Sequence, residues 1–230
     1  LKSLFEIPDC PREINQHALH EYLTYQYVPY PRCIVDGLSK LPPAHFLVFD
    51  ENGISTSPYW ELPTTESTAS EQDIHEQLWY TLEESVKLRM QSDVPLGAFL
   101  SGGVDSSLIV ALMQRNSSER IKTYSIGFPV KEYDETSHAR AVAKHLDTDH
   151  HEFQVTPSAT DILPKLVWHY DEPLADSSAI PTWYVSQMTR QEVTVALSGD
   201  GGDELFAGYP RYQAVDLVRK IERWPGLKWL

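Results

Sequence analysis

Beyond residue 95 the sequence alternates short apolar segments with helical ones, and this alternation restricts the possible folds more than any other feature. The apolar segments span 97–100, 122–128, 150–155 and 193–197, and the expected helices span 105–115, 134–146, 159–170 and a stretch from about 203. Strands that alternate with helices are typical of a parallel sheet with helices on both faces. We therefore expect an α/β fold with a doubly wound parallel sheet.

The N-terminal part of the chain follows a different pattern. Residues 14–26 place apolar side chains on one helical face, and Asn52-Gly53 predicts a hairpin turn between two short strands. Residues 57–73 are poor in aliphatic side chains and indicate a linker, whereas apolar residues at four-residue spacing predict an amphipathic helix over 74–90. The expected organisation is a first domain over 1–60, a linker over 61–73 and a second domain over 74–230.

Composition excludes several classes of partner. The formal net charge is -14, which disfavours nucleic acid because a surface so negative repels phosphate backbones. No run of about 18 apolar residues is present, so we expect no membrane partner. Cys10 and Cys33 form no metal-binding spacing, and the first residues form no signal peptide, so a cytoplasmic protein is expected. The chain begins at Leu1 without Met, which suggests a piece of a longer protein.

A polar loop follows the first strand of the expected sheet. Ser101-Gly102-Gly103 lies at its carboxyl end, where parallel sheets bind ligands. The glycines allow a close approach to backbone amides, and the helix that begins near Asp105 directs its N-terminus to the same place. The loop suits a phosphate or pyrophosphate, but it is no common P-loop because it contains no lysine. A carboxylate beside a phosphate requires a cation between them, so Asp105 implies Mg²⁺. Alternatively, Asp105 caps the helix.

A second loop of the same kind follows the strand over 193–197. Ser198-Gly199 ends that strand, further glycines follow, and three acidic residues lie close behind, namely Asp200, Asp203 and Glu204. Carboxyl ends of strands in one parallel sheet meet at one edge. We therefore expect both loops to face the same crevice.

These motifs resemble those of a known family. SGGVDSS (101–107) resembles the pyrophosphate loop of the ATP-pyrophosphatase, or PP-loop, superfamily. LSGDGGDELFAGY (197–209) is similar to the second signature of its glutamine-hydrolysing asparagine synthetases, and the stretches 123–128 and 133–153 also fit that branch. Residues 20–53 resemble the tail of the family's glutaminase domain. The resemblance implies a doubly wound sheet of the PP-loop, or adenine-nucleotide α-hydrolase, type, preceded by the antiparallel β-rich tail of a glutaminase domain and truncated at both ends.

The resemblance also implies an activity, that of asparagine synthase (glutamine-hydrolysing). In this family ATP adenylates the side-chain carboxylate of aspartate to β-aspartyl-AMP and PPi, and ammonia released from glutamine displaces AMP. The implied partners are therefore small molecules, namely aspartate, ATP, glutamine or ammonia, with Mg²⁺, and the full-length protein is expected to be a homodimer. The family's glutaminase nucleophile is an N-terminal cysteine, whereas this chain begins Leu1-Lys2.

Individual roles follow from matching positions. The β,γ-phosphates would be held by the first loop, at Ser101, Gly102, Gly103, Asp105 and Ser106. Leu100 and Ile126 would hold the adenine edge through backbone groups, and Ser198 and Gly199 would meet the ribose and α-phosphate. Asp105 and Asp203 would carry Mg²⁺. Asp200 stands where the family often has Glu, a candidate base for the attacking ammonia.

Two other functions are compatible with the same motifs. One is a related PP-loop amidotransferase that acts on another carboxylate, in a sugar or a peptide. The other is an ATP-binding module without catalysis, although binding alone would not require the acids Asp105 and Asp203. The residues over 171–181, DEPLADSSAIP, precede a helix and are candidates for lining the amino-acid site. Asp134-Glu135 either reaches the nucleotide or caps the next helix.

Overall fold

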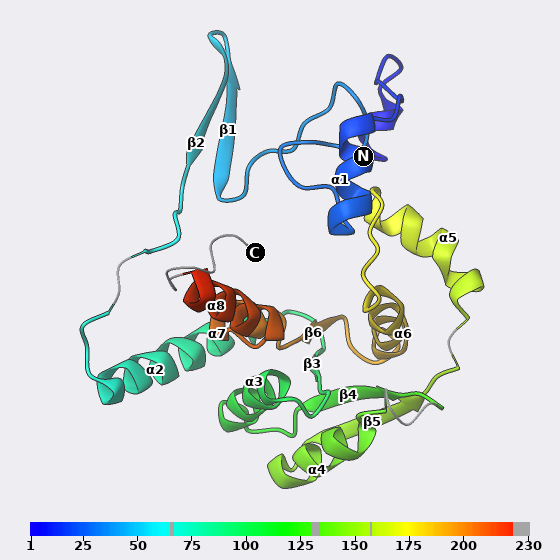
Figure 1. Ribbon diagram of the computed structural model, residues 1–230. Helices are drawn as coiled ribbons and strands as arrows, with labels where there is room; N and C mark the ends of the chain where they lie inside the picture. The colour runs from blue at the N-terminus through cyan, green and yellow to red at the C-terminus, as the bar shows by residue number, and fades with distance from the viewer. Residues whose placement is uncertain (65–66, 130–133, 157, 223–230) are drawn as a thin grey trace. The chain divides into compact units, whose positions relative to one another are not determined.

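The computed structural model describes residues 1–64, 67–129, 134–156 and 158–222 (Figure 1). The chain divides into two compact units. The first combines Leu1–Ala69 with Pro157–Trp183, and the second combines Ser70–Thr156 with Tyr184–Leu230. Each unit is described by itself below.

The second unit is built on a parallel sheet, as expected. Its strands lie in the order β5-β4-β3-β6, and their bounds are Leu96–Phe99 for β3, Lys122–Gly127 for β4, Asp149–Gln154 for β5 and Val195–Leu197 for β6. Ala98 of β3 is paired with Thr123 of β4 on one side and with Leu197 of β6 on the other. The central strand β3 is therefore flanked by β4 and β6, and the loops that follow β3 and β6 leave neighbouring strands at the same edge.

The buried core of this unit lies where α2 (Glu71–Arg89), α3 (Val104–Arg115) and α4 (Thr136–Leu146) pack together against the strands. The unit also contains α7 (Gly202–Phe206) and α8 (Pro210–Glu222). Ala98 and Leu100 at the end of β3 pack with Val110 and Leu112 of α3 and with Ala139 of α4 in one buried cluster. The small side chains of α4 let this helix approach the strands closely.

On the opposite face of the sheet, Glu192, which lies between α6 (Ala179–Thr189) and β6, makes polar contacts with β4. The hydroxyl of Tyr124 on β4 donates to the carboxylate of Glu192 over 3.2 Å, and Lys122 pairs with the same carboxylate at 3.1 Å. Burial raises the pKa of Tyr124, and the charge of Glu192 raises it further, so the hydroxyl remains a donor at neutral pH. The stretch that leads into β6 is thereby fixed to β4.

The first unit contains the expected helix and hairpin. The short 3-10 helix Leu4–Glu6 precedes α1 (Gln16–Tyr25), and the strands β1 (His45–Asp50) and β2 (Gly53–Pro58) form an antiparallel pair. The turn residues are Glu51 and Asn52, one position before the predicted Asn52-Gly53, and Gly53, the first residue of β2, has a φ of +105°, a conformation that favours glycine. The unit is completed by α5 (Ala159–Tyr170) and by the start of α6 (Ala179–Thr189), which continues into the second unit.

The predicted linker over 61–73 overlaps a stretch without regular structure, but its last three residues belong to α2. Between Pro58 and Glu71 the described residues form no helix or strand. Residues 157–183, however, belong to the same compact unit as residues 1–69, although we assigned them to the second domain. The domain boundaries drawn from the sequence stay predictions.

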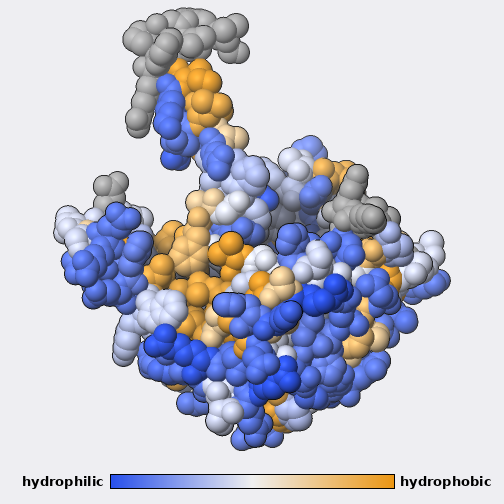
Figure 2. Space-filling view, turned by 90° about the horizontal axis from the view of Figure 1, so that it is seen from below, coloured by the Kyte–Doolittle hydropathy of each residue, from blue (hydrophilic) through white to orange (hydrophobic). Residues whose placement is uncertain are grey.

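Hydrophilic and apolar side chains are both exposed on the described part of the chain. Figure 2 shows hydrophilic residues over most of the face seen from below, with apolar side chains between them. Large apolar side chains are also exposed on the hairpin, where Phe49 is 76% and Ile54 is 69% exposed. Among the described residues, no helix has both the length and the apolar character needed to cross a bilayer.

Leu112 provides a test of the core. Its side chain is 1% exposed, and replacing it with alanine leaves a cavity between α3 and the sheet. We expect Leu112→Ala to lower the free energy of unfolding by about 2–5 kcal/mol. Leu88 of α2 is 63% exposed, so Leu88→Ala should change it by less than about 1 kcal/mol. Urea unfolding followed by circular dichroism measures both, and equal losses would contradict this description of the core.

Candidate active site

The first polar loop is shaped by hydrogen bonds among its own residues. The hydroxyls of Ser101 and Ser106 lie 2.9 Å apart, and the Ser101 hydroxyl also accepts from the amide of Gly103 over 3.2 Å. The Ser106 hydroxyl donates to the carbonyl oxygen of Gly103. These bonds join the end of β3 to the first turn of α3.

The two glycines of this loop have different surroundings. Gly102 has a φ of +86°, and a Cβ on it would lie 2.5 Å from the backbone nitrogen of Ala139 in α4. A Cβ on Gly103 would meet only the Ser101 hydroxyl, at 3.3 Å. Gly102 is thus required by packing and backbone conformation, whereas Gly103 leaves open space at the start of α3.

Gly103 is the N-cap of α3, and Asp105 lies within the first turn. The interpretation of Asp105 as the helix cap is therefore wrong. Because glycine has no side chain, Gly103 offers no side-chain acceptor to the first N–H groups of α3, although its carbonyl oxygen accepts the N–H of Ser107. A helix N-terminus of this kind favours an anion, both through its free donors and through the helix dipole.

The second loop lies directly against that first turn. A Cβ on Gly199 would be 2.7 Å from the amide nitrogen of Ser106, and one on Gly202 would be 2.4 Å from the carboxyl carbon of Asp105. A side chain at Gly199 would clash with the backbone of α3, whereas one at Gly202 would require the carboxylate of Asp105 to move. The structure thus brings both loops together, as the order of the strands predicts. The sequence analysis gave Gly202 no role, although the repeated glycines of this loop indicated a close approach of the backbone.

The acidic residues of the second loop have partners of their own. The hydroxyl of Ser198 donates to Asp200 over 2.9 Å, so these two candidate residues are bonded to each other. Asp203 lies in the first turn of α7, and its carboxylate occupies the space that a side chain at Gly208 would need. Glu204 accepts from the hydroxyl of Tyr209 over 2.8 Å, which raises the pKa of Tyr209 to about 12.

The two residues predicted to hold the adenine edge lie near the carboxyl ends of neighbouring strands. Leu100 follows β3, is 1% exposed and donates its N–H to the carbonyl oxygen of Tyr124 over 2.9 Å. Only its carbonyl group therefore remains for a ligand. Ile126 lies in β4, paired with Phe153 of β5. Their role toward adenine stays a prediction.

Asp134 has a structural role at the start of α4. Its side chain accepts from the backbone N–H of Thr136 over 3.2 Å and from the hydroxyl of the same residue over 2.8 Å. Of the two interpretations given above, these bonds favour a role of Asp134 at the helix start, whereas Glu135, the N-cap residue of α4, makes no side-chain cap bond. Tyr133, the first residue of one of the stretches that carry the resemblance, lies outside the described residues.

The donor set for a metal is limited. Within the described ranges, no group of three or more His, Cys, Asp or Glu side chains is arranged to hold a metal ion. Mg²⁺ is commonly held by one or two carboxylates together with substrate phosphates and water. Asp105 lies against Gly202, and Asp203 is the next residue along the chain. These two carboxylates therefore fit a donor set of that kind.

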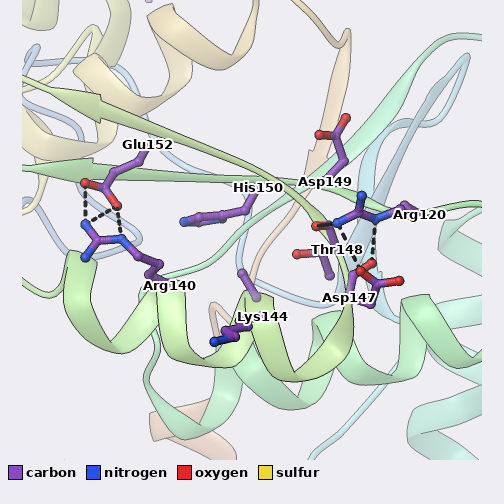
Figure 3. Close-up of a pocket in the computed structure, with 9 residues that line it drawn as sticks. Arg120, Arg140, Lys144, Asp147, Thr148, Asp149, His150 and Glu152 are labelled. Atoms are coloured by element: carbon purple, nitrogen blue, oxygen red, sulfur yellow. Dashed lines mark hydrogen bonds and ion pairs between the residues drawn. The ribbon is translucent and has the colours of Figure 1, made fainter.

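A separate pocket lies away from the loops, beside the amino end of β5. It has a volume of about 500 Å³ and lies between α4 and the edge strand (Figure 3). Its two arginines are already paired, Arg140 with Glu152 at 2.7 Å and Arg120 with Asp147 at 3.1 Å. Burial lowers the pKa of His150 in its wall, so this side chain adds no charge at neutral pH. The pocket contains no residue predicted for the active site.

Fold and site together define an α/β protein in which two glycine-rich loops meet at the carboxyl edge of a parallel sheet. Comparison with known proteins agrees with this class and refines it. Residues 77–229 match the asparagine synthase family, and residues 1–60 match the glutamine amidotransferase domain family. The chain belongs to the asparagine synthase family.

Several curated relatives carry related names. The chain is 37% identical to a putative asparagine synthetase [glutamine-hydrolyzing] 2 of Methanocaldococcus jannaschii, over 97% of this chain and 45% of the relative. It is 36% identical to asparagine synthetase [glutamine-hydrolyzing] 1 of Bacillus subtilis, over 94% of this chain and 34% of that protein. A putative asparagine synthetase of Mycobacterium bovis is 34% identical, over 98% of this chain and 35% of its own length. The chain thus spans less than half the length of these relatives.

The two glycines of the first loop give a direct test of its geometry. We expect Gly102→Ala to destabilise the folded chain by about 2 kcal/mol or more, because it combines a left-handed backbone with a clash against α4. Gly103→Ala should change the free energy of unfolding by less than about 1 kcal/mol. Chemical unfolding of both variants provides the measurement. A Gly102→Ala variant as stable as Gly103→Ala would show that the loop is packed differently.

Proposed function

We propose that this chain forms the ATP-binding part of an amide ligase that adenylates the side-chain carboxylate of aspartate and then amidates it with ammonia derived from glutamine. Membership of the asparagine synthase family supports ligase chemistry, and the match of residues 1–60 to a glutamine amidotransferase domain supports glutamine as the nitrogen source. The acceptor and the adenylate intermediate are inferred from the family resemblance of the two loops.

The observation that carries the proposal is the contact between the loops. Gly202 touches the carboxylate of Asp105 and Gly199 touches the backbone of Ser106, so the two motifs form one site. A single motif at a helix start would suit many anions. Two facing loops with carboxylates on both sides suit a triphosphate that is bound together with a cation.

The residues of the first loop would bind the phosphates. The N-terminus of α3 would donate backbone hydrogen bonds to the β,γ-phosphates at the open position above Gly103. Ser101 and Ser106 would keep the loop in shape, because their hydroxyls are already bonded to each other. Ser198 and Gly199 would border the α-phosphate and ribose from the opposite loop. The site thereby fixes the nucleotide in one orientation, with pyrophosphate directed toward α3.

Asp105 and Asp203 would hold Mg²⁺. When bound, such an ion supplies charge neutralisation for the phosphates and for the departing pyrophosphate. Without a cation, each carboxylate placed about 4 Å from a phosphate charge would cost roughly 4 kcal/mol at an effective dielectric constant of 20. Asp200, held by Ser198, would accept a proton from the attacking ammonia.

Substitution of the two carboxylates tests this assignment. In the full-length protein, Asp105→Asn and Asp203→Asn should each lower aspartate-dependent ATP–PPi exchange by about a thousandfold, because several kcal/mol of charge stabilisation are lost. Asparagine has the same size, so the variants should fold. Mg²⁺-dependent ATP binding, measured by calorimetry, should weaken as well.

A matched control separates this effect from a general effect of charge. Asp161 lies in the first turn of α5, and Asp161→Asn should leave the exchange unchanged. Near-wild-type exchange in both site variants would overturn the metal assignment and favour a structural role of the two carboxylates, whereas ATP binding without any exchange in the wild type would indicate an ATP-binding module without catalysis. Exchange that depends on a sugar or peptide carboxylate instead of aspartate would identify another amidotransferase.

A further inference from the structure

The segment over 171–178 joins parts of the chain that match different families. It lies between α5 and α6, within the region that matches asparagine synthase. It nevertheless belongs to the same compact unit as residues 1–69, most of which match the amidotransferase domain. In Figure 1 the yellow chain between α5 and α6 passes beside α1.

Glu172 is the centre of this contact. One of its carboxylate oxygens accepts the backbone N–H of Ile34 over 2.7 Å, and the other pairs with the ammonium of Lys40 at 2.5 Å. The same ammonium donates to the carbonyl oxygen of Val28 over 2.5 Å. The side chain of Glu172 is 18% exposed, so water competes little for these bonds. Both oxygens of the carboxylate are thus engaged by the N-terminal part of the chain.

Two neighbouring contacts extend this link. The N–H of Ala175 donates to the carbonyl oxygen of Gln26 over 2.8 Å, where α1 ends in a left-handed residue with a φ of 68°. Asp171 accepts from the ammonium of Lys2 over 2.6 Å, and this contact helps to lower the pKa of Asp171 to about 2. We call the set formed by Glu172, Ile34, Lys40, Gln26 and Ala175 the clasp.

The clasp combines more contacts than an ordinary surface ion pair. Exposed ion pairs contribute little, because water and salt screen them. Here the carboxylate also satisfies a backbone N–H, and a half-buried donor left without its acceptor is costly. The two sides are far apart in sequence and match different family regions, so the bonds act between parts with different expected chemistry.

We propose that Glu172 is a positioning residue that couples the glutaminase part of the enzyme to the synthetase part, by holding the segment over 171–178 against the N-terminal region. This inference rests on the proposed function. The segment leads directly into α6, which continues into the unit that carries the loops. A loose clasp would therefore impair the use of ammonia made in the first part, while ammonia supplied from solution would still be used.

The test compares nitrogen sources in the full-length protein. Glu172→Gln keeps an oxygen for the Ile34 N–H but loses the charge pair with Lys40. We expect amide formation from glutamine to fall about tenfold, the size of one lost charged hydrogen bond. Amide formation from added ammonium chloride, and release of glutamate from glutamine, should each stay within about twofold of the wild type. Lys40→Met should have the same effect, and the double variant should lose little more, because both residues act in one contact.

Hydrogen exchange gives a readout independent of activity. Peptides that cover 171–178 should exchange faster in Glu172→Gln than in the wild type, whereas peptides from β3 and α3 should not change. Glu84→Gln is the matched control, because it removes an exposed ion pair with Lys87 on α2 and should affect neither exchange over 171–178 nor nitrogen use.

Distinct outcomes overturn the two proposals. An equal loss with both nitrogen sources, or no loss at all, would overturn the coupling role of Glu172. Unchanged exchange over 171–178 would overturn the clasp itself. A wild-type protein that forms no amide from either nitrogen source would refute the proposed function, and the coupling role with it, whatever the exchange data show.

Discussion

The contact between the second glycine-rich loop and the first turn of α3 is the constraint on which the rest of the site depends. Gly199 lies so close to the backbone of Ser106 that no side chain fits between them, and Gly202 lies against the carboxylate of Asp105. Such an approach is possible only because β3 and β6 are adjacent and parallel, which makes their following loops leave the same edge. The order of the strands therefore brings the two loops together, and the glycines allow the second loop to reach the carboxylate of Asp105.

Different kinds of contact stabilise the two units. The second unit depends on apolar packing, with small residues of α4 set against the end of β3. In the first unit, polar contacts connect segments that are distant in sequence, and the carboxylate of Glu172 holds a backbone amide and an ammonium together. Polar contacts of this kind are directional. Their main effect is to select one arrangement of the chain, and their contribution to stability is smaller.

Much of the fold could be predicted from local pattern, because strands and helices of the second unit differ clearly in periodicity. The hairpin was equally accessible, since Asn52-Gly53 is a strong turn signal. The association of residues 157–183 with the N-terminal region could not be predicted, because it depends on contacts such as Glu172 with Lys40, which leave no periodic signal.

The candidate site was only partly predictable for a similar reason. Its residue types and their place at the strand ends followed from the motifs, and the meeting of the two loops followed from the strand order. The bond between Ser198 and Asp200, and the use of the Leu100 N–H within the sheet, could not be predicted from the sequence and were found only in the structure.

The glycine at the N-cap of α3 also has a wider consequence. Glycine in place of serine or aspartate at this position costs only a few tenths of a kcal/mol, so an unfilled helix end is nearly neutral for folding. An anion bound there would accept hydrogen bonds from the free N–H groups of α3, so its binding would raise the melting temperature of the protein.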